Sequence, residues 1–578
     1  MLPSQDSPAQ ALLPWPARLA IFAAAALPSL IAFNRPPSVH MMRELAAFFF
    51  WGLGVAAVGV VAAGVRVPWR ALRPLHLLLA VLGAGVLVTW VALQSVAGPK
   101  LSALAFLGSA ALVACAGGMA ARSRQAHDWL VWLFAGWLFA GLVNSCVGVL
   151  QVYVPDWTGN HLVAAARTPG RAVGNIYQPN SLATYLLWAM VGLVGLMVMK
   201  RLRVAWGCAA MLLLCLGLAL SGSRMGLVGL FGLAVWGWAA HSLGRPARAL
   251  LVVAPLVYGL AQLVLTQLQS AVVVQAGVRH ILRGGDVTSS RLGVWQQAFE
   301  IAAQRPLTGV GFGEFNTAWT LTPFATRHPG PWDHAHNLFV HWIVEFGWPL
   351  AAVLGGLIVW AAIAAWRNLR RQVNTQRALS GCLLAAVGLV GLHSQLEFPL
   401  WYPFFLLPIA FAWGYLLSIL PRETNSQPTT AGSLRPVLLA GVVLSTATVL
   451  AFGDFLRAFQ LAYAVDRRLP LPASVASARS TVLFSAYVDW IEATELDATT
   501  AVSRRARQFI IDRKLLAAWA RAAAREGRAE HSQYLLQRLR EFCSADPGLE
   551  PAACESVKAV DASSVPGSVA VFDWRRLL

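Results

Sequence analysis

Charged residues are scarce in this sequence. Only 12% of its 578 residues are Asp, Glu, Lys or Arg, whereas 57% are hydrophobic. A soluble protein could not bury so much apolar surface, so the composition excludes a soluble globular fold and predicts a polytopic membrane protein. The net charge of +19 does not indicate nucleic-acid binding. Its basic residues lie in short clusters between apolar runs, which is the pattern that orients helices in a membrane.

The sequence also lacks the motifs of nucleotide, redox and metal chemistry. The glycine-rich segment 308–313 does not match G-x-G-x-x-G and has no Walker lysine, so we predict a turn there. No Cys-x-x-Cys pair is present, and we expect neither a metal nor a cofactor. Five of the seven cysteines lie in apolar runs as small core residues. Cys543 and Cys554 flank a polar segment and would form a disulfide in an oxidising compartment.

Long apolar runs are abundant instead. Since a membrane helix needs about 20 apolar residues, they predict an all-α, polytopic fold with about 12 or 13 spans. We expect these spans at 17–34, 43–65, 73–95, 101–120, 129–151, 181–199, 204–221, 224–241, 249–267, 338–366, 378–394, 400–420 and 436–456. The first is predicted as a span because no signal-peptide cleavage site stands out. The run 338–366 is longer than a bilayer requires, which suggests a tilt.

Basic clusters occur in every second short connection. They lie at 66–73, 122–124, 200–203, 245–248, 367–377 and 422–435. The positive-inside rule places these connections and the N-terminus in the cytoplasm, and an odd number of spans places the C-terminus outside. We therefore predict a transmembrane domain over 1–456 with a long outer loop at 268–337. Residues 457–578 show Ala, Leu and charged residues at helical spacing, which predicts a C-terminal helical domain on the outer side.

A polar motif directly precedes the run that begins at Leu338. It contains Asp333, His334, His336 and Asn337. Ionisable groups at membrane depth are costly and usually face a cavity or a site. An imidazole can act as a general base toward a hydroxyl, and Asp333 could orient one of the two rings. The alternative is that Asp333 or Asn337 caps the helix that follows, which would explain one polar residue and leave both histidines unexplained.

Two further ionisable residues follow within that run. His341 lies on a different part of the helix from His336, and we expect it at the membrane interface. Glu345 is a candidate cavity residue.

Three arginines lie on the predicted outer face. Arg171 opens a polar loop, Arg224 follows a polar turn, and Arg291 opens an amphipathic stretch. A guanidinium at this surface can bind a phosphate through two parallel hydrogen bonds. The alternative is that each arginine extends to the lipid head groups.

Amide and aromatic residues gather in the loop that Arg171 opens. Asn175, Tyr177, Gln178 and Asn180 could bind sugar hydroxyls or a developing oxyanion. Turn chemistry is the alternative, and it explains Asn180 well and Gln178 poorly.

Another outer turn contains His393, Glu397 and Tyr402. Glu397 could pair with an arginine. Tyr402 could donate a hydrogen bond to a substrate or belong to the aromatic belt at the interface.

Together these motifs resemble the O-antigen ligase/polymerase superfamily of bacterial inner-membrane glycosyltransferases. The matching pieces are Ser223-Arg224, Arg291 with Trp295, the run 305–311 and His336-Asn337. Within that superfamily, residues 174–180 and 393–400 resemble the PglL-type O-oligosaccharyltransferases. The resemblance covers most of residues 160–420 and, more loosely, the C-terminal domain.

The resemblance implies a transfer that uses neither a metal nor ATP. A glycan on undecaprenyl pyrophosphate would pass to Ser or Thr hydroxyls of periplasmic proteins such as pilins, at the outer face of the inner membrane. His336 corresponds to the family's essential histidine, and Gln178 and Tyr402 to functional positions of the PglL type. Arg224 and Arg291 correspond to arginines that hold the pyrophosphate, and Arg171 is a third candidate.

The expected chemistry agrees with these residues. Pyrophosphate is already a good leaving group, so the enzyme must supply a base for the hydroxyl and positive charge for the departing group. The supporting candidates are Asp333, His334, Asn337, Asn175, Asn180, His393 and Glu397. The expected partners are the lipid-linked donor, the acceptor protein and membrane lipid, with no nucleic acid.

Two alternatives to protein glycosylation are considered. A ligase to the lipid A core, or an O-antigen polymerase, belongs to the same superfamily and differs in its acceptor. A transporter of lipid-linked sugars would show charges deep within spans and inverted repeats, and the sequence shows neither.

Overall fold

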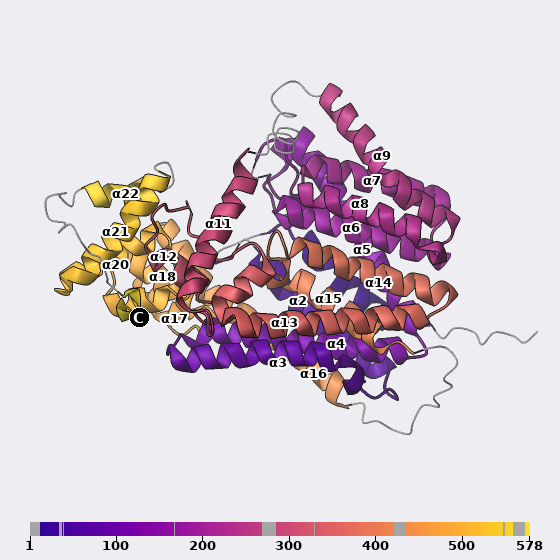
Figure 1. Ribbon diagram of the computed structural model, residues 1–578, viewed down its shortest axis with the longest axis horizontal. Helices are drawn as coiled ribbons and strands as arrows, with labels where there is room; N and C mark the ends of the chain where they lie inside the picture. The colour runs from indigo at the N-terminus through magenta and orange to yellow at the C-terminus, as the bar shows by residue number, and fades with distance from the viewer. Residues whose placement is uncertain are drawn as a thin grey trace, which may run out of the picture. The chain divides into compact units, whose positions relative to one another are not determined.

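The computed structural model describes residues 12–33, 37–38, 40–166, 168–268, 285–328, 330–420, 435–546, 550–558 and 573–577. In these ranges the regular elements are helices and no strand is present (Figure 1). The predicted all-α class is therefore confirmed. Residues 269–284, in the predicted long outer loop, and Arg422, in a predicted basic connection, lie outside the described ranges.

Within the described ranges, ten helices are long and apolar enough to cross a membrane. They are α2 (Met41–Val61), α3 (Trp69–Ala92), α4 (Ala97–Arg122), α5 (Ala126–Tyr153), α6 (Pro179–Val198), α7 (Val204–Ser221), α9 (Arg245–Leu268), α13 (Leu338–Arg371), α14 (Asn374–His393) and α16 (Arg435–Asp466). Shorter apolar helices are α1 (Trp15–Ala26) with η1 (Leu27–Leu30), α8 (Arg224–Ala239) and α15 (Pro403–Ser418). Each predicted run coincides with one of these helices, and the chain is a polytopic α-helical membrane protein.

The chain divides into two compact units. The first comprises Met1–Leu77, Gly108–Gly284 and Leu357–Val449, and the second comprises Leu78–Leu107, Gly285–Gly356 and Leu450–Leu578. The boundaries between the units fall inside α3, α4, α13 and α16. Helix α16 also continues through residue 456, so the predicted domain boundary there stays a prediction.

The first unit is built around α6. This helix packs against α5, α7, α8 and α14, and Figure 1 shows several of these helices side by side. The core contains Trp137 and Trp188, which stack with ring centroids 4.9 Å apart. Gly192 allows α6 to approach α5 closely, because a Cβ there would lie 2.7 Å from the Phe134 carbonyl oxygen. Aromatic stacking and small residues at helix crossings therefore fix this bundle.

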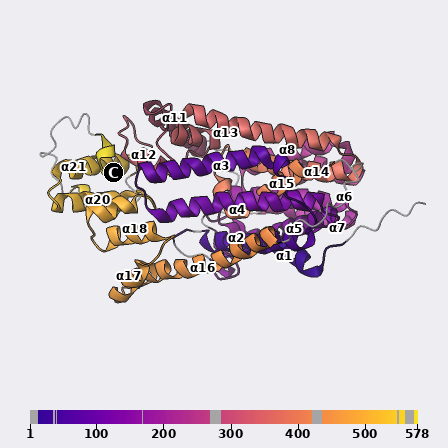
Figure 2. The same cartoon turned by 90° about the horizontal axis from the view of Figure 1, so that it is seen from below.

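The second unit contains α11 (Gly285–Gln304), α12 (Phe315–Leu321) and the C-terminal helices. These are α17 (Pro472–Ala478), α18 (Ser485–Glu495), α19 (Thr500–Ala506), α20 (Arg513–Arg525), α21 (Ala529–Ala545), α22 (Pro551–Lys558) and η7 (Trp574–Leu577). From α18 to α22, consecutive helices pack on one another, as Figure 2 shows for α18, α20 and α21. The predicted disulfide between Cys543 and Cys554 is present and joins α21 to α22.

Helix α13 is interrupted at Gly347, which has φ +75°. The glycine-rich segment 308–313 lies along this break: the Val310 and Gly311 N–H groups donate to the carbonyl oxygens of Val344 and Glu345, both at 2.9 Å. A Cβ at Gly309 would collide with the Glu345 backbone. The predicted turn at 308–313 therefore packs against α13. The run 338–366, whose extra length suggested a tilt, contains a break in the helix.

Candidate functional site

The polar motif of the second unit forms the turn that leads into α13. The Asn337 side-chain oxygen accepts hydrogen bonds from the N–H groups of Phe339 and Val340, at 3.0 and 3.1 Å. Asn337 is therefore the cap of the helix, as the alternative reading proposed. His336 precedes it with φ +51°, a left-handed conformation that is uncommon for residues other than glycine. Such a conformation is often found at functional sites.

Aromatic residues hold the His336 loop. The ring of Trp332 meets the ring of His336 edge to face, with centroids 4.9 Å apart. The Trp332 indole N–H donates to His328 Nδ1 at 3.2 Å. The Trp295 indole N–H on α11 donates to the Ala335 carbonyl oxygen at 2.8 Å. Arg291 lies one helical turn before Trp295 and is partly buried. Two tryptophans thus fix the backbone and the ring of the candidate base.

The second histidine of the motif belongs to a chain of acids and imidazoles. His334 Nδ1 lies 2.8 Å from Asp333 Oδ1, and its ring stacks on His341 with centroids 5.3 Å apart. His341 Nε2 lies 3.3 Å from Glu345 Oε1, which also accepts from the Gly313 N–H at 2.7 Å.

His341 and Glu345 are both buried. Residues 338–346 form the helical segment before the break at Gly347, and the expectation that His341 lies at the membrane interface stays a prediction. The i, i+4 spacing of His341 and Glu345 was the sequence signal for this pair.

A buried charge network also belongs to the second unit. Glu314 lies 2.6 Å from Arg507 and 3.7 Å from Lys100, and all three side chains are less than 5% exposed. Gln508 donates to the same carboxylate at 2.8 Å, and Lys100 donates to the Phe312 carbonyl oxygen at 2.7 Å. The network joins the glycine-rich segment to the C-terminal helices. Sequence reasoning missed it, because its members are distant in sequence and form no motif.

In the first unit, three of the predicted motifs meet at Asn180. Its amide NH2 donates to Glu397 Oε1 at 3.0 Å, and its carbonyl oxygen accepts from the Ser223 hydroxyl at 2.7 Å. Ser223 in turn accepts from the Gly226 N–H at 3.0 Å and caps α8, whose first residue is Arg224. The amide loop, the α8 turn and the acidic turn therefore form one polar cluster.

Arg171 adds a second cation to this cluster. Its Nε donates to the Ser221 carbonyl oxygen at 2.9 Å. Burial lowers the pKa of Arg171, the nearby charge of Arg224 lowers it further, and the carboxylate of Glu397 opposes both effects. Arg171 and Arg224 are thus close enough to repel each other, which is the arrangement that favours an anionic ligand.

The remaining residues of the amide loop have structural contacts. The Gln178 side-chain oxygen accepts from the Ser181 N–H at 2.5 Å and caps α6, so local structure does explain this residue. The Asn175 side chain bonds the backbone at Leu30, Leu162 and Ala164, at 2.8 to 3.0 Å, and is buried. The Asn175 side chain is therefore hydrogen-bonded to the backbone of the protein itself.

Arg43 and Tyr177 support this loop from α2. Arg43 is buried, donates to the Asn175 carbonyl oxygen at 2.6 Å and lies 5.1 Å from the ring centroid of Tyr177. Tyr177 has φ +64° and donates its hydroxyl hydrogen to the Ala32 carbonyl oxygen at 2.8 Å. Arg43 was not among the residues singled out in the sequence.

His393 and Tyr402 also belong to the first unit. His393 is buried at the end of α14, with Nδ1 2.9 Å from the Thr184 hydroxyl. The partly buried Tyr402 ring packs against His40 at 4.5 Å and Phe404 at 5.4 Å, just before α15. The ring therefore lies among aromatic side chains, and both predicted roles of Tyr402 stay predictions.

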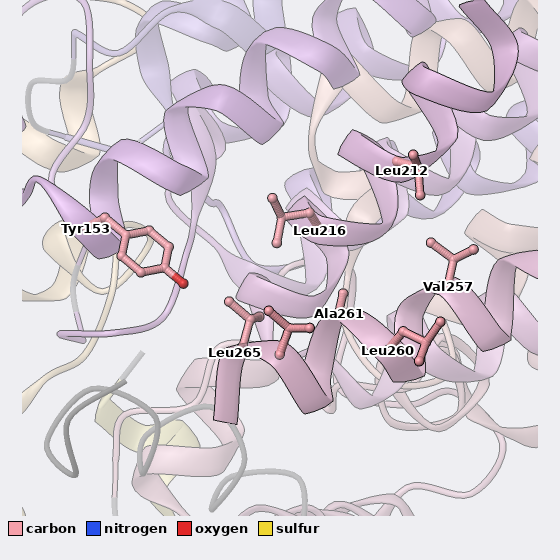
Figure 3. Close-up of a pocket in the computed structure, with 8 residues that line it drawn as sticks. Tyr153, Leu212, Leu216, Val257, Leu260, Ala261 and Leu265 are labelled. Carbon is pink, nitrogen blue, oxygen red and sulfur yellow. The ribbon is translucent and has the colours of Figure 1, made fainter. Parts of the chain in front are cut away.

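An apolar groove of about 400 Å³ lies between α7, α9 and the end of α5 (Figure 3). Leu212 and Leu216 of α7 face Leu260 and Leu265 of α9, and Tyr153 lies at one end. Such a wall suits a hydrocarbon chain. Over the described ranges, no group of three His, Cys, Asp or Glu side chains is arranged to hold a metal ion.

Comparisons with known proteins agree with the motifs. Residues 209–355 match the family model for O-antigen ligase, and residues 382–548 match the model for the C-terminal part of a virulence factor membrane-bound polymerase. The chain is 29% identical over 289 residues to the general O-oligosaccharyltransferase of Acinetobacter baylyi, covering 47% of this chain and 48% of the relative. It is 27% identical over 129 residues to the ComP-specific O-oligosaccharyltransferase of the same organism, covering 22% of each.

The chain thus spans about half of the first of these relatives and about a fifth of the second. The first family model spans α7 to the first part of α13 and includes the His336 loop, and the second spans α14 to α21. These matches support a PglL-like member of the O-antigen ligase superfamily.

Proposed function

We propose that this protein transfers a glycan from undecaprenyl pyrophosphate to Ser or Thr hydroxyls of acceptor proteins. The reaction takes place at the periplasmic face of the bacterial inner membrane. Both relatives are named as O-oligosaccharyltransferases. The observation that carries the proposal is that Asn337 caps the helix directly after His336, whose backbone has φ +51°. The imidazole is therefore not needed for the helix start and is assigned to chemistry.

The proposed reaction is a single displacement. The acceptor hydroxyl oxygen attacks the anomeric carbon of the glycan, and the bond from that carbon to the pyrophosphate oxygen breaks. The hydroxyl proton passes to the His336 imidazole, and the lipid pyrophosphate leaves with the electron pair. Arg171, Arg224 and Arg291 are the candidates for stabilising its negative charge.

The other candidates have supporting roles in this proposal. Tyr402 donates a hydrogen bond to the substrate, and the amide NH2 of Gln178 does the same while its oxygen caps α6. The Asp333–His334 pair adds acid–base groups beside the His336 turn. The groove between α7 and α9 accommodates part of the hydrocarbon chain of the donor.

We propose periplasmic proteins as acceptors, with pilins among them. The longer alignment is to a relative named as general, and the shorter one is to a relative named as specific for ComP. A second candidate function is ligation of O-antigen to lipid A core, which the match to the O-antigen ligase model favours. The two functions differ in the acceptor, so an acceptor test separates them.

Reconstitution tests the proposal directly. Purified protein in liposomes receives a lipid-linked glycan and either a pilin-type acceptor or lipid A core, and the glycosylated product is measured by mass. The proposal expects transfer to the protein, and loss of transfer in His336→Ala. His241→Ala, at an exposed histidine of the first unit, is the matched control and should retain transfer. Full activity of His336→Ala, or transfer to lipid A core alone, would reject the proposal.

A further inference from the structure

A buried carboxamide connects the His336 loop to the C-terminal helices. Asn316 lies on α12 and is buried. Its side-chain oxygen accepts from the Ile511 N–H at 2.7 Å, and its NH2 donates to the Trp332 carbonyl oxygen at 3.1 Å. Ile511 directly precedes the cap of α20, and the ring of Trp332 packs on His336. Asn316 therefore connects the start of α20 to the residue that orients the candidate base.

Arg327 makes a second attachment from the same loop. Its guanidinium donates to Glu541 Oε2 at 2.8 and 3.0 Å, and to the carbonyl oxygens of Trp319 and Thr322 at 2.8 and 2.6 Å. It also lies 4.5 Å from the ring centroid of Phe542. The arginine side chain is only 2% exposed. Each of the three guanidinium nitrogens thus donates at least one hydrogen bond. Together these bonds fix residues 319–327 against α21.

The end of α21 is itself restrained. Cys543 follows Phe542 and is bonded to Cys554 on α22. Arg513 donates to the Phe542 carbonyl oxygen at 2.9 Å and to the Asp546 carbonyl oxygen at 2.7 Å. The Cys543–Cys554 disulfide and the buried Arg513 therefore restrain the end of α21, which Arg327 contacts.

We propose that Asn316 and Arg327 are positioning residues through which the C-terminal helices hold the His336 loop in its reactive geometry. The inference rests on the proposed role of His336 as the base. It goes beyond that role by making α20 and α21 part of the reaction machinery. A displacement of about 1 Å at a reacting group can reduce a rate about 100-fold, so the support of this loop affects the rate directly.

The chain provides matched controls for this inference. Arg505 pairs with Asp489 at 2.7 Å, and Arg479 pairs with Glu492 at 2.9 Å. Both pairs join C-terminal helices, and both arginines are at least 49% exposed. Among the residues that the structure describes, neither pair is hydrogen-bonded to α12 or to residues 322–337. Loss of either pair therefore changes the C-terminal helices without releasing the loop.

The test uses full-length protein in lipid nanodiscs and two measurements. Hydrogen exchange reports the protection of the backbone amides of residues 330–340 and of α20. Transfer kinetics give kcat, and the KM of the donor. The variants are Asn316→Asp, which retains an acceptor for the Ile511 N–H and removes the donor to Trp332, Arg327→Gln, and the control Arg505→Gln.

The proposal expects faster exchange in residues 330–340 of both test variants, with α20 still protected. It expects kcat to fall about 10- to 100-fold with a much smaller change in the donor KM, and no change in Arg505→Gln. A fall in kcat without faster loop exchange, or the reverse, would overturn the proposal. If the wild-type protein transferred no glycan, the proposed function would fail, and loop exchange alone would decide whether these residues hold the loop.

Discussion

The amide of Asn180 donates to the carboxylate of Glu397 at 3.0 Å and joins two turns that are 217 positions apart in the chain. The same side chain accepts from Ser223, next to Arg224. A neutral amide thus organises a cluster that contains one carboxylate and two guanidinium groups. Because Glu397 offsets only part of the repulsion between Arg171 and Arg224, the cluster retains an excess of positive charge for a pyrophosphate.

We expect Arg224→Ala and Arg171→Ala to raise the donor KM about tenfold or more, because each removes a charge-assisted contact to the pyrophosphate. The KM for the acceptor protein should change little. Steady-state kinetics with varied donor check this, with Arg245→Ala at an exposed position of α9 as the control. Unchanged donor kinetics in both variants would contradict the pyrophosphate role.

We expect Glu345→Ala to reduce the free energy of unfolding by about 2–4 kcal/mol. The variant removes the acceptor of the Gly313 N–H and leaves the buried His341 without the carboxylate beside it. Thermal unfolding of the purified protein checks this, and Glu300→Ala at an exposed site on α11 should leave the midpoint unchanged. Equal midpoints for wild type and Glu345→Ala would show that the pair is not structural.

Gly347→Ala should destabilise the protein by at least about 1–3 kcal/mol, because a residue other than glycine is strained at φ +75°. The added Cβ would also lie 2.5 Å from the Leu307 carbonyl carbon. Gly356→Ala in the same helix is the matched control. No atom lies within 4 Å of its added Cβ, so this variant should be neutral or slightly more stable. Similar unfolding curves for the two variants would argue against the break in α13.

Asp512 should make stability depend on pH. Burial raises its pKa from 3.8 to about 6, although it caps α20 by accepting from the Leu515 N–H. Because the folded-state pKa is the higher one, its contribution is fully present below about pH 4 and is lost as the pH rises through about 6. Each pKa unit corresponds to about 1.4 kcal/mol.

Asp512→Asn should therefore flatten this part of the stability profile between pH 4 and pH 7 while retaining the cap. Unfolding measured across that range checks the slope, and Asp497→Asn in an exposed turn should retain the wild-type slope. A wild-type slope in Asp512→Asn would assign the pH dependence to other groups.

Cys543 and Cys554 should resist maleimide labelling until a reductant is added, since they are bonded to each other. Replacing both by serine should lower the free energy of unfolding by about 2–3 kcal/mol, as expected for a short closed loop. Because Cys146 and Cys208 are free and exposed, the labelled positions are identified by mass, and labelling of Cys543 or Cys554 in the native protein without reductant would contradict the bridge.

The sequence predicted the helices of the membrane region because the apolar runs are local features. It did not predict the break at Gly347, which depends on hydrogen bonds from residues 310 and 311 to a distant helix. The burial of His341 was likewise not predicted, because it depends on contacts with residues outside its own helix, such as Phe315. The network of Glu314, Lys100 and Arg507 was equally hidden, because no spacing rule relates its members.

The candidate site was predicted from motifs, and the structure refines what each residue does. Asn337 and Gln178 cap helices, and Asn175 is bonded within the protein. Asn180 donates a hydrogen bond to Glu397, which the motifs did not predict, and the expected pairing of Glu397 with an arginine stays a prediction. Local patterns identified the polar residues, but only the folded chain shows which of them are already bonded to the protein.

The left-handed backbone at His336 has a practical consequence for trapping the donor complex. Alanine at that position would remove the imidazole and also disfavour the local conformation, so two effects would be combined. Asparagine tolerates positive φ better than most residues, so His336→Asn should keep the turn while removing the base. Such a variant would be the better choice for capturing lipid-linked glycan in an otherwise intact protein.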